Sequence, residues 1–271
     1  MIRVLIITTG YSSFVSRIQE CSQLTLTGVL DCQASVRLER YCNGQGVPYQ
    51  ILKDQNSLLQ KWIEERQPEV IAVFRMPFLL RKEIFSLPRY GSLNLHPSLL
   101  PAYRGPNPWF WLYYYQEEKS GITIHRIDEG EDTGDMVCQH TFPVPTGIRL
   151  DDLKQTATEL GAAWMVRVLC NLPHIQSLPQ PSVSPTPRAR NLSNYRGLIH
   201  WNEWPTERIW HLLRGFPEVL PENVPDLPSH TALVPQSCSN ETIHLPPGHL
   251  TSRGDTFILS CKDGSIVLTQ A

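Results

Sequence analysis

The sequence predicts an α/β fold with a mostly parallel sheet and flanking helices, followed by a small β-rich C-terminal module. Short apolar runs alternate with stretches of helical character over residues 1–172, whereas the end of the chain contains closely spaced strand-like runs. A chain of 271 residues is long enough for a full domain plus a smaller one. We therefore predict a first domain over residues 1–172, a linker over 173–190 and a second domain over 191–271.

Five apolar runs in the first domain have the length and composition of buried parallel strands. They span residues 4–8, 24–30, 48–52, 70–74 and 92–96, and helical stretches such as residues 57–66 lie between them. This alternation predicts a Rossmann-like sheet covered by helices. The turn after the first run has one glycine and lacks the Gly-x-Gly-x-x-Gly pattern of dinucleotide sites, so we expect no nicotinamide cofactor.

The sequence also predicts elements beyond the fifth strand. Residues 122–127 alternate as a strand, and residues 150–172 predict a long closing helix. The linker prediction depends on five prolines among small and polar residues in 172–190. A short helix is expected to open within 201–206 and to end at Gly215, and residues 256–268 predict a hairpin around an Asp-Gly turn.

Composition limits the class of protein. A net charge of −2 with 41% hydrophobic residues is typical of a globular protein and argues against a mainly electrostatic partner such as bulk nucleic acid. The seven cysteines are odd in number, widely spaced and without a Cys-x-x-Cys pair, which indicates a reducing compartment and no metal site. The N-terminal apolar run is too short for a signal peptide or a membrane span. We expect a cytoplasmic protein without membrane contact.

The most informative segment of the chain contains Asn94 and His96, at the end of the fifth predicted strand. Residues i and i+2 of a strand project from the same face, so the two side chains point into one space. Pro97 cannot continue a central strand, which places the pair at its carboxyl end. Ligands bind at that edge in open α/β sheets.

A second candidate group is Asp132, in an acidic, glycine-containing turn over residues 128–135. A carboxylate near a histidine favours the imidazolium, and an amide can donate a hydrogen bond to an oxygen that becomes negatively charged. Asn94, His96 and Asp132 together suit acyl transfer through a tetrahedral intermediate.

Residues 94–101, 103–105, 121–123 and 128–135 resemble the 10-formyltetrahydrofolate-dependent formyltransferase family. This family includes glycinamide ribonucleotide, methionyl-tRNA and sugar-amine formyltransferases. The resemblance implies that Asn94, His96 and Asp132 form the catalytic triad and that 10-formyltetrahydrofolate is the cosubstrate. It is clear over residues 1–170 and weaker beyond them.

The resemblance also implies which residues contact the folate. The loop after the fourth strand would hold the pterin largely through backbone groups, and the acidic turn would add contacts. The expected cofactor-binding residues are Arg75, Met76, Pro77, Phe78, Leu79, Asp128 and Gly130. Pro77 departs from the common glycine-containing loop and removes one amide donor, so the family's pterin contacts do not transfer one by one.

Residues 109–115 form the densest aromatic run of the chain. Aromatic residues at helical spacing are more often core than binding surface, so we expect most of this run to be buried. The resemblance implies that residues 109–115 form a helix that begins beside the catalytic histidine. Asn107 and Trp109 are the residues that we expect to face the acceptor.

The acceptor is inferred from charge. Residues 31–55 carry three basic and three acidic residues, and residues 191–271 carry five basic and eight acidic ones. This balance argues against a tRNA phosphate backbone. We favour a primary amine on a small or carrier-borne acceptor, such as an amino sugar or an amino acid derivative, with methionyl-tRNA as the runner-up. The alternative functions are a 10-formyltetrahydrofolate hydrolase and a catalytically silent folate-binding or assembly module. A homodimer is a further partner prediction that the sequence leaves open.

The expected mechanism is direct transfer without a metal. The neutral amine attacks the formyl carbon while Asn94 and a protonated His96 stabilise the oxyanion. Asp132 would hold His96 and help to remove the proton of the amine.

Overall fold

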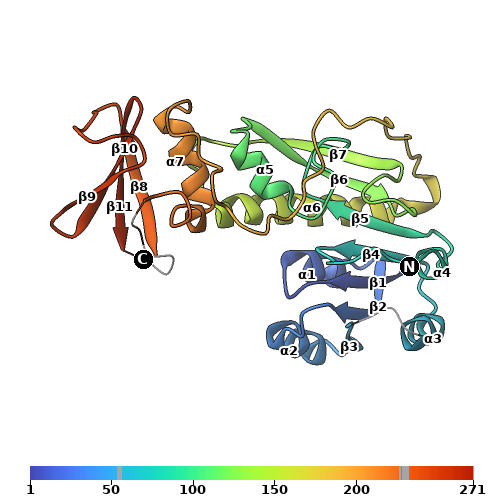
Figure 1. Ribbon diagram of the computed structural model, residues 1–271. Coiled ribbons are helices and arrows are strands. Elements are labelled where there is room, and N and C mark those ends of the chain that lie inside the picture. The colour runs from blue at the N-terminus through green and yellow to red at the C-terminus, as the bar shows by residue number, and fades with distance from the viewer. Residues whose placement is uncertain (54–56, 226, 228–231, 271) are drawn as a thin grey trace. The chain divides into compact units, whose positions relative to one another are not determined.

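The computed structural model describes residues 1–53, 57–225, 227 and 232–270 (Figure 1). The chain divides into two compact units. The first unit contains residues 1–108, 120–142 and 155–189, and the second contains residues 109–119, 143–154 and 190–271. Each unit is described by itself.

The first unit is built on a seven-stranded sheet with the order β3-β2-β1-β4-β5-β6-β7. The strands are β1 (Ile2–Thr8), β2 (Leu24–Asp31), β3 (Tyr49–Ile51), β4 (Val70–Phe74), β5 (Ser92–His96), β6 (Lys119–Arg126) and β7 (Met136–Pro143). The first five strands pair in parallel, and β6 pairs with β5 in the antiparallel direction. The predicted mostly parallel sheet is therefore confirmed.

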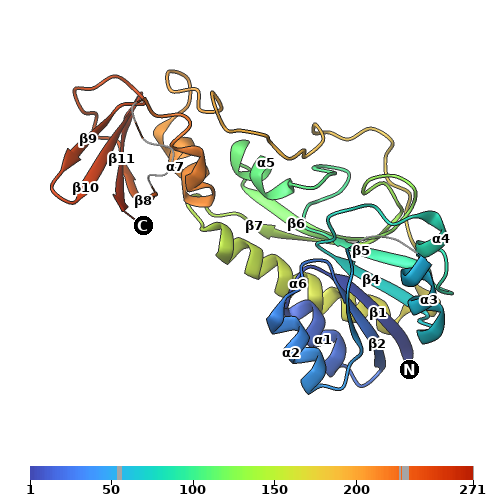
Figure 2. The same ribbon diagram turned by 60° about the horizontal axis from the view of Figure 1, so that its bottom comes forward.

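Helices cover both faces of this sheet, which explains why its central strands are apolar throughout. The helices are α1 (Ser13–Glu20), α2 (Val36–Gly44), α3 (Ser57–Arg66), α4 (Lys82–Phe85) and α6 (Leu150–Cys170), with a short 3-10 helix at Leu172–His174. Figure 2 shows α1 and α2 on one side of the sheet and α3 and α4 on the other. Leu5 and Ile7 of β1 pack in one core cluster with Ile63 of α3 and Ile84 of α4.

The segment that was predicted as a linker belongs to the first unit as far as residue 189. Leu178 forms a β-bridge with Met136, and its amide donates to the Met136 carbonyl over 2.8 Å. The amide of Ala189 donates to the carbonyl of Arg104 over 2.8 Å. The prolines of this segment disfavour helix, but they leave carbonyls and side chains available to bind neighbouring loops. We call residues 177–189 the strap.

The second unit contains helices α5 (Pro108–Tyr114) and α7 (Thr206–Gly215), the 3-10 helix Pro217–Val219 and a separate sheet. The four strands are antiparallel in the order β8-β11-β10-β9. They span β8 (Leu233–Ser239), β9 (Leu250–Arg253), β10 (Thr256–Cys261) and β11 (Gly264–Gln270). The predicted hairpin is β10–β11, where Cys261 pairs with Gly264, and the β-rich C-terminal module is confirmed.

The aromatic run on α5 contributes to the core of the second unit, as expected from its spacing. Phe110 and Tyr113 are fully buried. The Tyr113 ring stacks on the ring of His211 from α7, with centroids 4.5 Å apart and planes 10° apart. Nδ1 of His211 accepts a hydrogen bond of 2.9 Å from the amide of Gly147. His211 is therefore a buried, neutral core residue.

This buried histidine predicts a loss of stability in acid. Burial lowers the pKa of His211 from 6.5 to about 4. Between these values the unfolded chain binds a proton that the folded chain does not, so stability falls as the pH decreases from about 6.5 to about 4, by up to about 3 kcal/mol. Urea unfolding of the wild type and of His211→Gln across this range measures it. Equal pH slopes for the two proteins would contradict the prediction, and His200→Gln, at a half-exposed site, is the control.

All seven cysteines are free thiols. In the part of the chain that the structure describes, no helix combines the length and the hydrophobicity needed to span a bilayer.

Candidate active site

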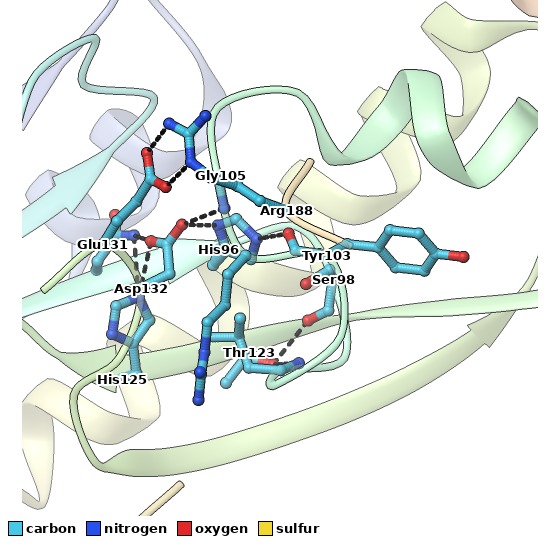
Figure 3. Close-up of polar contacts among 12 residues, drawn as sticks. His96, Ser98, Tyr103, Gly105, Thr123, His125, Glu131, Asp132 and Arg188 are labelled. Carbon is cyan, nitrogen blue, oxygen red and sulfur yellow. Dashed lines mark hydrogen bonds and ion pairs between the residues drawn. The ribbon is translucent and has the colours of Figure 1, made fainter. Parts of the chain in front are cut away.

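His96 lies at the carboxyl end of β5 and points toward Asp132 (Figure 3), and Asn94, two residues earlier on the same strand, also contacts Asp132. Nδ1 of His96 is 3.4 Å from Oδ2 of Asp132, and Nδ2 of Asn94 donates to Oδ1 of the same carboxylate over 3.3 Å. Nε2 of His96 is 3.0 Å from the carbonyl oxygen of Tyr103. The Asp132 carboxylate therefore contacts both Asn94 and His96, which project from the same face of β5.

The Asp132 carboxylate is held in its ionised form. Burial by itself would raise its pKa, but His96, His125 and the amide of Gly105 together hold the pKa below its ordinary value. The Gly105 amide donates to Oδ2 over 3.0 Å. Asp132 has a backbone φ of 53°, in the left-handed region that few residues other than glycine adopt. The surrounding contacts must therefore hold this turn in place.

His96 is neutral at neutral pH, because burial lowers its pKa and outweighs the opposing effect of Asp132. The protonated ring of the expected mechanism considered the carboxylate and not the loss of solvent, and the charge of His96 during the reaction stays a prediction. Nε2 faces the carbonyl of Tyr103 and Nδ1 faces Oδ2 of Asp132, so both ring nitrogens lie against acceptors. Asp132 therefore stabilises the ring when it gains a second proton.

A second buried histidine, His125, completes the site and was missed from the sequence. It is the register partner of Asn94 in the β5–β6 pairing. Its Nδ1 donates to the carbonyl of Arg126 over 2.8 Å, and its Nε2 lies 3.1 Å from Nδ2 of Asn94. The same Nε2 is 3.4 Å from Oδ1 of Asp132. The alternation of residues 122–127 predicts a strand that includes His125, but only the pairing of β5 with β6 places His125 opposite Asn94.

Asn94 is oriented by contacts of its amide nitrogen. Nδ2 donates to Oδ1 of Asp132 over 3.3 Å and lies 3.1 Å from Nε2 of His125. Reversing the amide would place its oxygen against the ionised carboxylate, which is unfavourable. The role of Asn94 as an N–H donor to the oxyanion stays a prediction.

The predicted pterin loop follows β4 in the first unit. Arg75 has a φ of 60°, and its carbonyl accepts a hydrogen bond of 2.5 Å from the hydroxyl of Thr9. Met76 and Phe78 are partly buried against the core, whereas Leu79 is exposed. The loop thus presents partly buried and exposed apolar side chains, and an apolar surface of this kind suits a flat heteroaromatic ring. The contacts of Arg75–Leu79, including Pro77, with folate stay a prediction.

Asp128 and Gly130 shape the turn that presents Asp132. Oδ1 of Asp128 accepts from the amide of Gly130 over 3.0 Å and from the hydroxyl of Thr133 over 2.8 Å. A Cβ at Gly130 would lie 2.0 Å from the Thr133 hydroxyl, so a larger residue would displace the Thr133 side chain from Asp128. The structure explains both residues within the turn, and their contact with folate stays a prediction.

Asn107 and Trp109 are placed in different units. The amide of Asn107 donates to the carbonyl of Ala189 over 2.9 Å, and Trp109 lies in the first turn of α5. Their role in acceptor binding stays a prediction. Among the described residues, no group of three or more histidine, cysteine, aspartate or glutamate side chains is arranged to hold a metal ion.

Acyl-group transfer is the chemistry that this site suits best, because a neutral imidazole beside an ionised carboxylate can take a proton from a nucleophile. A family model described as "Formyl transferase" matches residues 34–169, half of the chain. The chain belongs to the formyl transferase family.

The curated relatives include methionyl-tRNA formyltransferases. The chain is 33% identical over 164 residues to the one from Clostridium beijerinckii, which covers 60% of this chain and 53% of the relative. It is 41% identical over 118 residues to the one from Acidobacterium capsulatum, covering 44% of this chain and 38% of the relative. The chain thus spans about half the length of the first of these relatives, and less of the second.

Solved structures share the fold at low sequence identity. An N-formyltransferase from Helicobacter canadensis, in complex with folinic acid and dTDP-3-aminofucose, has a TM-score of 0.72 and 18% identity, covering 100% of this chain and 99% of that chain. Glycinamide ribonucleotide transformylase 1 from Symbiobacterium toebii has a TM-score of 0.59 and 19% identity, covering 66% and 94%.

Proposed function

We propose that the protein transfers a formyl group from 10-formyltetrahydrofolate to a primary amine on a small or carrier-borne acceptor, with an amino sugar favoured. The observation that supports this most is the contact of one ionised carboxylate, Asp132, with both His96 and Asn94 at the end of β5. Family membership supports formyl transfer, and the apolar loop after β4 suits the folate ring. The seven free thiols support a cytoplasmic location.

The mechanism follows from the protonation states. The folate supplies an activated formyl group. The neutral amine attacks the formyl carbon, and Asn94 donates an N–H to the oxygen that becomes negative. Nδ1 of His96 accepts the proton that the amine loses on forming the C–N bond, directly or through one water, and Asp132 stabilises the imidazolium. The charged ring also stabilises the oxygen that becomes negative, and His96 returns the proton to the departing nitrogen.

Three observations support an amino-sugar acceptor over tRNA. Residues 191–271 carry more acidic than basic residues, which disfavours a phosphate backbone. The Helicobacter canadensis enzyme, crystallised with a nucleotide-linked amino sugar, is similar over the whole chain. The methionyl-tRNA formyltransferases are similar over about half of their length or less. Their higher sequence identity makes formylation of methionyl-tRNA the second candidate function.

The acceptor prediction is tested by incubating the protein with 10-formyltetrahydrofolate and separate acceptors, with products identified by mass spectrometry. The acceptors are a nucleotide-linked 3-amino or 4-amino sugar, charged initiator tRNA, and water alone. We expect a formylated sugar and, at moderate salt, no tRNA binding or formylation. Formylated tRNA would establish the second candidate, and formyl loss without an amine would indicate a hydrolase. Folate binding without turnover would indicate a silent binding module. His96→Ala is the negative control.

A further inference from the structure

The strap contacts two loops of the site: the loop of Gly105 and the turn that carries the Asp132 carboxylate. One loop holds Gly105, whose amide binds Asp132, and the other is the turn of Asp132 itself. The strap pairs with the first loop through main-chain hydrogen bonds of Ala189. Arg188 forms an ion pair with Glu131, next to the catalytic carboxylate.

Gln180 is the strap residue that binds both loops at once. Its Nε2 donates to the carbonyl of Asp132 over 2.9 Å and to the carbonyl of Gly134 over 2.7 Å. Its Oε1 accepts from Nη2 of Arg104 over 2.7 Å and from Nε over 3.1 Å. All four hydrogen bonds use one amide, so a single side chain joins the Asp132 turn to the residue before Gly105.

The turn needs such support because of its backbone. Asp132 has a φ of 53°, and the left-handed conformation of a residue other than glycine costs free energy. The two carbonyls that Gln180 binds lie on either side of Thr133, so they fix the turn on both flanks. Gly105 is equally constrained, because a Cβ there would lie 3.0 Å from the Ala189 carbonyl oxygen.

We propose that Gln180 is a positioning residue of the active site, which acts through the Asp132 turn and Arg104 to hold the carboxylate against Gly105 and His96. The strap is then part of the catalytic unit, and not a connection between units. This inference deepens the proposed function and rests on it for the expected effect on turnover. The coupling of Gln180 to the Asp132–Gly105 hydrogen bond can be measured without any substrate.

The variants are chosen to separate the two ends of the Gln180 side chain. Gln180→Glu keeps an oxygen for Arg104 but replaces the donor that binds the Asp132 and Gly134 carbonyls. Gln180→Met keeps the length of the side chain and removes both functions. Gln176→Met is the matched control, at an exposed position just before the strap.

The first readout does not depend on any substrate. Exchange of the Gly105 amide hydrogen reports how firmly that amide is bound by Asp132. We expect exchange at least about tenfold faster in both Gln180 variants, the scale of weakening one charge-assisted hydrogen bond. The amide of Ile71 in the core and the Gln176 control should remain unchanged. Unchanged Gly105 exchange in the folded variants would overturn the inference.

The second readout is catalytic. Gln180→Met is expected to lower kcat at least about tenfold, and to add nothing in an Asp132→Asn background. A full additional loss in that background would overturn the inference, since Gln180 would then act independently of Asp132. If the wild type formylates no amine, the proposed function fails, and Gly105 exchange still decides whether Gln180 positions the carboxylate.

Discussion

Replacing Asp132 by asparagine is expected to lower the rate of formyl transfer roughly 100-fold or more, the scale of losing one acid–base group. Asparagine keeps the shape of the side chain and an oxygen for the Gly105 amide. It removes the negative charge that would stabilise the His96 imidazolium when the amine gives up its proton. The loss should therefore appear in kcat, whereas the affinity for a folate analogue should change little.

The same substitution is expected to shift the pH dependence of the rate. In the wild type the pKa of His96 lies below its ordinary value of 6.5 because of burial, so activity should rise with pH through that lower value and then level off. Asp132 raises the pKa of His96 against the effect of burial. Without the carboxylate the acid limb moves to lower pH. A pH profile of single-turnover rates for both proteins measures the shift.

A carboxylate in the same turn provides the control. Asp135 accepts a hydrogen bond of 3.3 Å from the hydroxyl of Ser177 in the strap, and it is not a partner of His96. Asp135→Asn should retain most of the activity and the wild-type pH profile. If folded Asp132→Asn keeps wild-type turnover, the carboxylate has no part in proton transfer.

The sequence predicted the parts of the site that depend on residues close together in the chain. Strand alternation places Asn94 and His96 on one face, and Pro97 marks the end of β5. The acidic turn brings Asp132 to them, and its Gly134 packs so close to the Arg126 carbonyl that a Cβ there would lie 2.0 Å from the oxygen. The sheet and the C-terminal hairpin were predicted from the same short-range periodicities.

The parts that the sequence did not predict depend on contacts between distant residues. His125 meets Asn94 only because β5 and β6 pair in a particular register. The charge state of His96 depends on its burial, which no local pattern contains. The strap looked like a linker because prolines exclude regular structure, yet one glutamine side chain, Gln180, binds two loops nearly 30 residues apart in the sequence.

Replacing His96 by alanine is expected to reduce turnover at least roughly 100-fold, because the ring is the proton acceptor of the proposed mechanism. Its Nδ1 lies 3.4 Å from Asp132, where an imidazolium would be stabilised. The expected folate contacts lie elsewhere, in residues 75–79 and the turn over 128–135, so the affinity for a folate analogue should be little changed. Calorimetry of binding and steady-state kinetics on the same protein separate these effects.

A purely structural role for His96 predicts a different pattern, because the ring is buried and its loss leaves a cavity. His96→Gln fills most of that space and can still donate to the Tyr103 carbonyl, so it should be as stable as the wild type but inactive. Added imidazole should restore part of the activity of His96→Ala, since the cavity can hold a free ring beside Asp132. An active, stable His96→Gln variant would show that His96 only supports the loop of Tyr103 and would leave Asp132 to accept the proton.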